Sequence, residues 1–220
     1  MGWDPSLIRA LNAALNEATV RGIDYIGARD EVRLLVDVCA LPAEGPMDAD
    51  PRRVLVLYEV AVIEVVLRTD RSSERPAYGP VIPLANMADV AEFASSLSWM
   101  HPMCGWDFID TEGFRTDFPS TPSLAVRAPA LRPAHSLFWF TECGRQEGRA
   151  SVAYCLEGVV YFQALRVERA DGSPVPVVEF AEDGERWWKA FFQHDARVSV
   201  QAQREAAEAR LSWRTTGPSW

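Results

Sequence analysis

The sequence predicts an α+β fold in which a mainly antiparallel, twisted sheet is covered by about three helices. One observation behind this prediction is a series of short apolar runs with strand-like alternation. The other is a hairpin signal, because Gly144–Gly148 supplies turn residues between the aromatic and β-branched segments His135–Cys143 and Ala150–Arg169. Helical segments stand before, between and after these runs, and that order favours an α+β arrangement. With 220 residues and no linker between two cores, we expect one domain over residues 1–220.

The first expected element is a helix over Pro5–Arg21. Asp4 is a suitable N-cap, Pro5 suits the first helical position, and Gly22 is typical of the residue after a helix end. Apolar side chains recur along one face at helical spacing: Leu7, Ile8, Leu11, Leu15 and Ala18. Such a stripe is typical of a helix that packs on the body of its own domain.

Two strand candidates follow this helix. Glu31–Leu41 alternates between apolar and polar residues, as a half-buried strand does. Arg52–Thr69 is apolar on both faces apart from Glu59 and Glu64. Fully extended, these 18 residues would span roughly 59 Å at ~3.3 Å each, which is too long for one domain of this size. We therefore expect the segment to bend or break near Tyr58–Ala61.

The central part of the chain is predicted to hold a second helix over Asn86–Met100. Asn86 can cap its free amides, and Asp89 is placed to reach back toward the cap. Residues 101–134 follow no sustained period and contain five prolines among aromatic residues. Segments of this length without a repeat are often functional or packed as a cover, so this one is expected to wrap one side of the sheet.

The last third contains the hairpin and two further helices. Gly158 is expected to mark a bend within the second arm of the hairpin, and Val175–Phe180 is expected to return as a strand. Glu182–Gln193 is predicted to be helical. Most of Asp195–Leu211 is also predicted to be helical, although its first residues alternate as a strand would.

Composition excludes several classes of function. The chain carries 22 Lys and Arg against 31 Asp and Glu, a net charge of −9, whereas a nucleic-acid binder needs clustered cations. The first 25 residues contain no secretory signal pattern, and no apolar run approaches the ~20 residues that span a bilayer. A soluble, cytoplasmic protein without membrane contact is expected. Its four cysteines form no Cys-x-x-Cys pair and are expected to be free thiols.

The sequence lacks the motifs that would assign catalytic chemistry. There is no Gly-x-Ser-x-Gly elbow, no His-Glu-x-x-His and no Gly-x-Gly-x-x-Gly, and no cofactor is expected. His101 and Cys104 have the spacing of zinc ligands, although a buried histidine and a core thiol are the simpler interpretation. His135 and Cys143 could not both complete such a site, since on one strand they would lie roughly 26 Å apart.

Two groups of acidic residues are weaker candidates for a functional site. Asp48 and Asp50 could supply carboxylate oxygens as ligands to Mg²⁺ or Ca²⁺. The simpler interpretation is that they are exposed acids at turns. Carboxylates also interrupt the predicted strands, at Glu59, Glu64, Glu142 and Glu157. A buried carboxylate needs a partner, for which Arg33, Arg68 and Arg166 are candidates. These acids could otherwise point outward, because the register of a strand cannot be derived from sequence.

If the protein is an enzyme, possibly a hydrolytic one acting on a small molecule, its cleft is expected between the sheet and residues 101–118. The candidate catalytic residues are then His101, Cys104, His135 and Glu142.

The aromatic residues of Glu182–Gln193 are the most informative signal. Trp187, Trp188, Phe191 and Phe192 cover about 140° of this helix at 100° per residue, more than packing on a core usually needs. Core burial accounts for part of this load, and a contact with another chain could account for the rest. The leading hypothesis is a non-enzymatic protein-binding module, an adaptor or a neutraliser of a more basic protein. Its expected binding surface is Trp187, Trp188 and Phe191.

Overall fold

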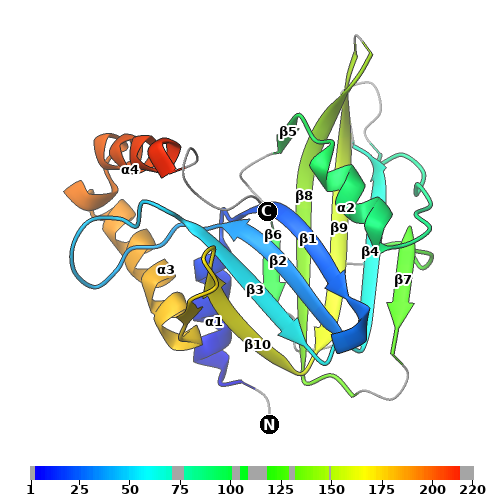
Figure 1. Cartoon of the computed structure of the whole chain (residues 1–220), viewed down its shortest axis with the longest axis horizontal. Helices are drawn as coiled ribbons and strands as arrows, with labels where there is room; N and C mark the ends of the chain where they lie inside the picture. The colour runs from blue at the N-terminus through cyan, green and yellow to red at the C-terminus, as the bar shows by residue number, and fades with distance from the viewer. Residues whose placement is uncertain are drawn as a thin grey trace.

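The computed structural model describes residues 3–70, 77–100, 105–108, 118–128, 132–148 and 150–213. Within these ranges helices pack against antiparallel strands, which confirms the predicted α+β class (Figure 1). The expected sheet is divided in two at a shared corner.

The first sheet has the strand order β1-β2-β3-β10-β11 in the described part of the chain. Its strands are β1 (Thr19–Ile26), β2 (Glu31–Asp37), β3 (Arg52–Tyr58), β10 (Ala164–Arg169) and β11 (Pro174–Val175). All neighbouring pairs are antiparallel. β1 was not expected from the sequence, because Pro5–Arg21 was predicted to be one helix.

The second sheet has the order β5-β8-β9-β4-β7, with β6 also pairing with β8. Its strands are β4 (Val62–Thr69), β5 (Trp99–Met100), β6 (Gly105–Phe108), β7 (Leu124–Arg127), β8 (His135–Glu147) and β9 (Ala150–Phe162). The long β8–β9 hairpin is the one that the sequence predicted. β6 and β7 show that parts of residues 101–134 add strands to this sheet, where an irregular cover was expected.

The two sheets are joined where the chain passes from β3 to β4 and from β9 to β10. β3 passes into β4 through Glu59, which adopts a left-handed conformation with φ 50°. Gln163 separates β9 from β10, and its amide donates to the carbonyl of Tyr58 at 3.0 Å. The amide of Ala61 donates to the carbonyl of Tyr161 at 2.8 Å. The predicted break near Tyr58–Ala61 is therefore confirmed.

Gly158 has a different role from the bend that was predicted for it. β9 runs through this residue without interruption. A Cβ atom at position 158 would lie 2.1 Å from Cζ2 of Trp139, on the neighbouring strand β8. Since Trp139 is fully buried, the glycine provides the space that its indole occupies.

The larger of the two apolar clusters in the described part of the chain receives side chains from both sheets and from α1 (Pro5–Leu15), and the smaller one joins Leu41 to Trp187, Ala190 and Val198. The largest side chains that are fully buried are Trp139, Phe162, Phe180, Leu11, Leu15, Leu34, Leu41, Leu55, Leu57, Ile63, Leu137 and Leu156. Leu11 and Leu15 belong to the stripe that the sequence predicted. Asp4 caps α1 by accepting from the amide of Ser6 at 2.7 Å, as predicted.

The end of α1 differs from the prediction. The helix ends at Leu15, and β1 begins at Thr19. Gly22 lies inside β1, where the register with β2 shifts between Val20 and Gly22. Thr19 and Val20 are β-branched and pair with β2, so strand pairing determines the conformation of residues that the predicted helix end at Gly22 had assigned to the helix.

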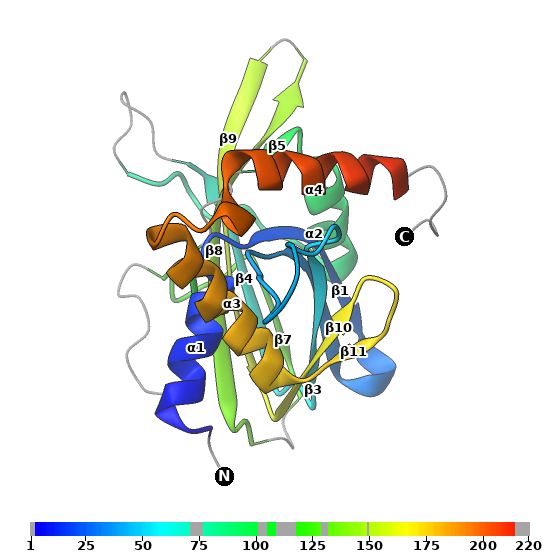
Figure 2. The same cartoon turned by 90° about the vertical axis from the view of Figure 1, so that its left-hand side faces the viewer.

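α3 (Val177–Phe192) lies beside α1 and covers the same side of the molecule (Figures 1 and 2). A Cβ atom on Gly184 would lie 2.3 Å from Cα of Ala14, so this glycine allows the two helix backbones to approach closely. The returning strand predicted over Val175–Phe180 is short, because only β11 forms and α3 begins at Val177. The burial of Phe180, Gly184 and Trp187 follows the period of a helix.

The remaining helices are α2 (Met87–Ser95) and α4 (Val200–Trp213). Asn86 caps α2 by accepting from the amides of Ala88 and Asp89, at 2.8 and 3.3 Å. α2 ends before Met100, since Trp99–Met100 forms β5 on the edge of the second sheet. α4 confirms the helix predicted for the last part of the chain and lies across the end of α3 (Figure 2).

Candidate functional site

A partly open groove lies where three elements meet: the loop between β2 and β3, α3, and α4. Its volume is about 200 Å³. Its walls are formed by Val38, Cys39, Ala40, Met47, Asp48, Ala49, Pro51, Trp187, Gln203, Ala206 and Ala207. We call it the α4 groove. Apolar side chains make up most of these walls, and they come from parts of the chain that are far apart in sequence.

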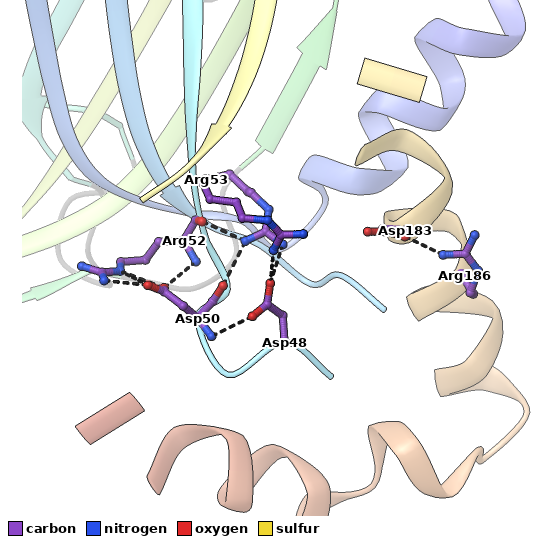
Figure 3. A network of polar contacts seen from close by, with 7 residues as sticks. Asp48, Asp50, Arg52, Arg53, Asp183 and Arg186 are labelled. Carbon is purple, nitrogen blue, oxygen red and sulfur yellow. Dashed lines mark hydrogen bonds and ion pairs between the residues drawn. The ribbon is translucent and has the colours of Figure 1, made fainter. Parts of the chain in front are cut away.

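A polar network holds the loop that forms one wall of the α4 groove (Figure 3). Asp48 accepts from the buried guanidinium of Arg53 at 3.0 Å and is also paired with Arg169. Asp50 binds Arg52 through two bonds of 2.8 and 2.6 Å. The carboxylates of Asp48 and Asp50 are thus engaged by arginines, and each also accepts from a backbone amide two residues further along, which favours acids at turns over a cation site; they are half-buried, however, and not exposed as expected.

The start of the loop is fixed to α3. Arg186 forms an ion pair with Asp183 at 2.5 Å (Figure 3) and donates to the carbonyl of Leu41 at 2.7 Å. The amide of Leu41 donates to the carbonyl of Asp183 at 3.0 Å. These bonds place the loop and α3 in a fixed relation, so two of the three walls are rigidly connected.

The walls of the α4 groove carry little free charge. Cys39 is half-buried, and burial raises the pKa of its thiol to about 11, so the thiol is neutral at physiological pH. Trp187 is only 8% exposed and packs with Leu41, Ala190 and Val198. Asp48 is the acidic residue of the lining, and its charge is balanced by the two arginines that bind it.

The third wall is α4, and it has the least buried contact of the three over its described side chains. Along α4, each side chain described through Glu208 is half-buried or exposed. Ala202 and Ala206 are the half-buried ones, and the side chain of Gln203 donates to the carbonyl of Val198 at 2.9 Å. α4 therefore covers the groove with small side chains and without an apolar anchor in the described part of the helix.

The aromatic residues of α3 divide between this groove and the surface. Trp187 lines the groove and stacks on Phe191, with 5.2 Å between ring centroids. Trp188 is half-buried, and its indole N–H donates to the carbonyl of Ala13 in α1 at 2.9 Å. Phe191 is 43% exposed and Phe192 is 73% exposed. We call Trp188, Phe191 and Phe192 the aromatic patch; their rings lie 5.6–6.0 Å apart.

Of the predicted binding surface, Phe191 is exposed, Trp188 is partly exposed and Trp187 is in the interior. Phe192 was recognised as part of the aromatic arc, but it was not included in the predicted surface although it is the most exposed of the four rings. The groove residues Cys39 and Met47 gave no signal in the sequence, because nothing local indicates that their loop meets α3 and α4.

The predicted catalytic residues are not gathered into one described site. His135 and Glu142 both lie on β8, seven residues apart, which places them about 23 Å apart and on opposite faces of the sheet. His135 is buried and stacks on Trp3, with 3.7 Å between ring centroids. His101 and Cys104 lie outside the described residues. Cys143 is also on β8, as the argument against a His135–Cys143 zinc site assumed.

The strand carboxylates have separate environments. Glu157 is fully buried and forms an ion pair with Arg68, the only one of the three proposed arginines that pairs with one of the four predicted carboxylates within the described chain. Arg33 and Arg166 pair with Glu31 and Glu168 instead. Glu64 pairs with Arg127, Glu59 lies exposed at the corner, and Glu142 is half-buried on β8.

Two groups surround the buried pair of Arg68 and Glu157. The ring of Tyr78 lies 4.1 Å from the guanidinium of Arg68. The thiol of Cys155 lies 3.3 Å from the Glu157 carboxylate, and burial, followed by that carboxylate, raises its pKa strongly. A protonated thiol beside an ion pair is a structural arrangement and not an activated nucleophile.

A second cavity of about 240 Å³ lies between α2 and the β8–β9 hairpin. Its lining residues are Leu67, Ile82, Leu84, Asp89, Glu92, Phe93, Ser96, Arg145 and Tyr154. Arg145 lies over the rings of Phe93 and Tyr154 and pairs with Glu147. Hydrogen bonds from Tyr154 and then Arg145 lower the pKa of Glu147, which keeps this carboxylate ionised. The guanidinium of Arg145 is thus already bound by other side chains of the protein.

The described ranges hold neither a cluster of metal ligands nor a membrane-spanning helix. No group of three or more His, Cys, Asp or Glu residues lies close enough there to hold a metal ion. Among the described helices, none combines the length and apolar character needed to traverse a bilayer. Comparisons with protein-family models, curated proteins and solved structures found no match to this chain.

Proposed function

We propose that this chain is a non-enzymatic protein-binding module, and that it contacts a more basic partner through the aromatic patch at the end of α3. The observation that carries the proposal is the exposure of Phe191 and Phe192 on a well-anchored helix. Large exposed aromatic side chains that lie together are typical of the energetic centre of protein interfaces.

The anchoring of α3 favours this role. Trp188 is bonded to α1, and the close contact at Gly184 holds the two helices together. Binding of a partner to the patch would therefore cost little conformational entropy, because the helix that carries the rings is already fixed in place.

Charge supports a basic partner. The chain has a net charge of −9, and Glu182 and Glu185 are exposed on the same helix as the patch. A net negative charge accelerates encounter with a positively charged protein and disfavours nucleic acid. The exposed Lys189 lies between these glutamates and Phe191 in sequence, so the support comes from the charge of the whole chain. We place this interaction in the cytoplasm, where a reducing environment keeps the cysteines as thiols.

The proposal is tested by affinity purification from the native host with the wild-type chain and the double variant Phe191→Ser/Phe192→Ser. We expect one stoichiometric basic protein with the wild type and its loss with the double variant. Val178→Ser is the matched control, since Val178 is 56% exposed on the same helix but lies 14 residues before Phe192. Circular dichroism confirms that each variant is folded.

The proposal fails if the wild-type chain elutes alone. It also fails if the double variant retains the same protein at the same ratio, because the patch would then contribute nothing to binding.

A further inference from the structure

We propose that the α4 groove is a binding site for a small uncharged molecule, an aromatic or branched aliphatic compound of about the size of indole. This proposal is independent of the protein-binding function, because it concerns the interior side of Trp187 and not the aromatic patch.

The volume and lining of the groove determine the size and polarity of the ligand. An apolar cavity of about 150 Å³ is large enough to take up benzene, so a groove of about 200 Å³ accommodates a somewhat larger ring system. Val38, Met47 and Pro51 form an apolar wall opposite α4, and Trp187 adds an aromatic side chain. Apolar surface of this kind gains more from contact with an apolar ligand than from contact with water.

The charge state of the walls requires a neutral ligand. The thiol of Cys39 is protonated, and Asp48 is already paired with Arg53 and Arg169. A charged ligand would lose its hydration without finding a free counter-ion among the lining residues. A neutral ligand has no such cost.

The small side chains of α4 leave the volume of the groove unfilled, and the exposure of the helix gives a ligand access to it. Ala206 and Ala207 face the groove with small side chains, so the wall they form leaves volume that a larger residue would occupy. The side chains of α4 that are described, those of residues 200–208, are all at least partly exposed, so this part of the helix has no buried apolar anchor. Local opening of such an element is a low-energy event, which gives a ligand a route into the groove.

Cys39 provides a site-specific readout. We would alkylate the full chain with N-ethylmaleimide, with and without indole, and follow each cysteine by peptide mass spectrometry. Indole is expected to slow alkylation of Cys39 several-fold in a saturable manner. The buried Cys143 is the internal reference, since it does not line the groove. Indole-3-acetate, which has the same ring but carries a charge, is expected to protect Cys39 much less.

Two matched variants test the location. Ala206→Leu fills the groove and is expected to weaken indole binding at least about tenfold in titration calorimetry. Ala202→Leu makes the same change one turn earlier on α4, outside the lining, and is expected to bind indole like the wild type. If Ala206→Leu lowers the helical circular dichroism signal, Ala207→Leu takes its place.

The proposal is overturned if Cys39 is alkylated at the same rate with and without indole. It is equally overturned if a folded Ala206→Leu variant binds indole as tightly as Ala202→Leu, or if indole-3-acetate protects Cys39 as well as indole does.

Discussion

The interior of the second sheet and the end of α3 are packed in opposite ways. In the sheet, Trp139 is fully buried over Gly158 with no space for one further carbon atom. At the end of α3, Phe192 is 73% exposed, and the neighbouring Trp187 borders a groove of about 200 Å³. Close packing in the sheet stabilises the fold, whereas the end of α3 has exposed apolar surface and unfilled volume, which is where we propose that other molecules bind.

The largest expected effect comes from the buried ion pair of the sheet. Arg68→Met removes the guanidinium from the fully buried carboxylate of Glu157 and should lower the free energy of unfolding by about 3 kcal/mol or more. Arg127→Met is the matched control, because the Arg127–Glu64 pair is exposed and should cost less than about 1 kcal/mol. Urea denaturation measures both. Equal losses would show that burial does not distinguish the two pairs.

The next effect tests the closest contact in the sheet. Gly158→Ala should lower the free energy of unfolding by about 2–3 kcal/mol, because Trp139 must move to admit the methyl group. Gly22→Ala in β1 is the control, since its nearest neighbour would be Leu35 Cβ at 3.9 Å, an ordinary contact. The double variant Gly158→Ala/Trp139→Leu should recover part of the loss. If the double variant recovers no stability, the strain does not arise from contact with the indole of Trp139.

A smaller effect is expected where α1 and α3 meet. Gly184→Ala introduces a methyl group 2.5 Å from the Cβ of Ala14, which forces the helices apart. The gain in helix propensity of about 1 kcal/mol offsets part of that cost, so we expect a net loss of about 1–2 kcal/mol. The melting temperature by circular dichroism measures it. An increase in stability would mean that the two helices separate without penalty.

The smallest effect on stability is expected at the aromatic patch. Phe192→Ser should change the free energy of unfolding by less than about 0.5 kcal/mol, because most of this side chain is already in solvent. Binding of the proposed partner should nevertheless weaken. A large loss of stability in urea denaturation would instead make Phe192 part of the core and remove the contrast between the two regions.

Local patterns predicted those parts of the fold that local chemistry controls. The N-cap at Asp4 and the cap at Asn86 are where the sequence indicated, since a cap depends on residues within one turn. The break between β3 and β4 followed from length alone, because no domain of this size holds so long a straight strand. In the candidate site, the arc of four aromatic rings correctly indicated that α3 carries more apolar surface than one core face needs.

Other features depended on contacts between distant segments. Residues 19–21 were included in the predicted first helix because Gly22 is typical of a helix end, yet they belong to β1, which pairs with β2. Gly158 and Gly184 are the same residue type and differ only in what packs against them. Gly158 leaves space for the indole of Trp139, whereas Gly184 contacts the backbone of α1. The α4 groove could not be predicted, since its walls come from a loop, α3 and α4.

By itself, the sequence determined the α+β class, the hairpin, the caps, the acidity and the aromatic load of α3, because each depends on residues that are close together along the chain. The tertiary structure decided which strands share a sheet, which arginine neutralises Glu157, and which of the four rings of α3 face solvent. Those outcomes depend on how surfaces from distant segments fit together, and burial and register are properties of that fit and not of any one segment.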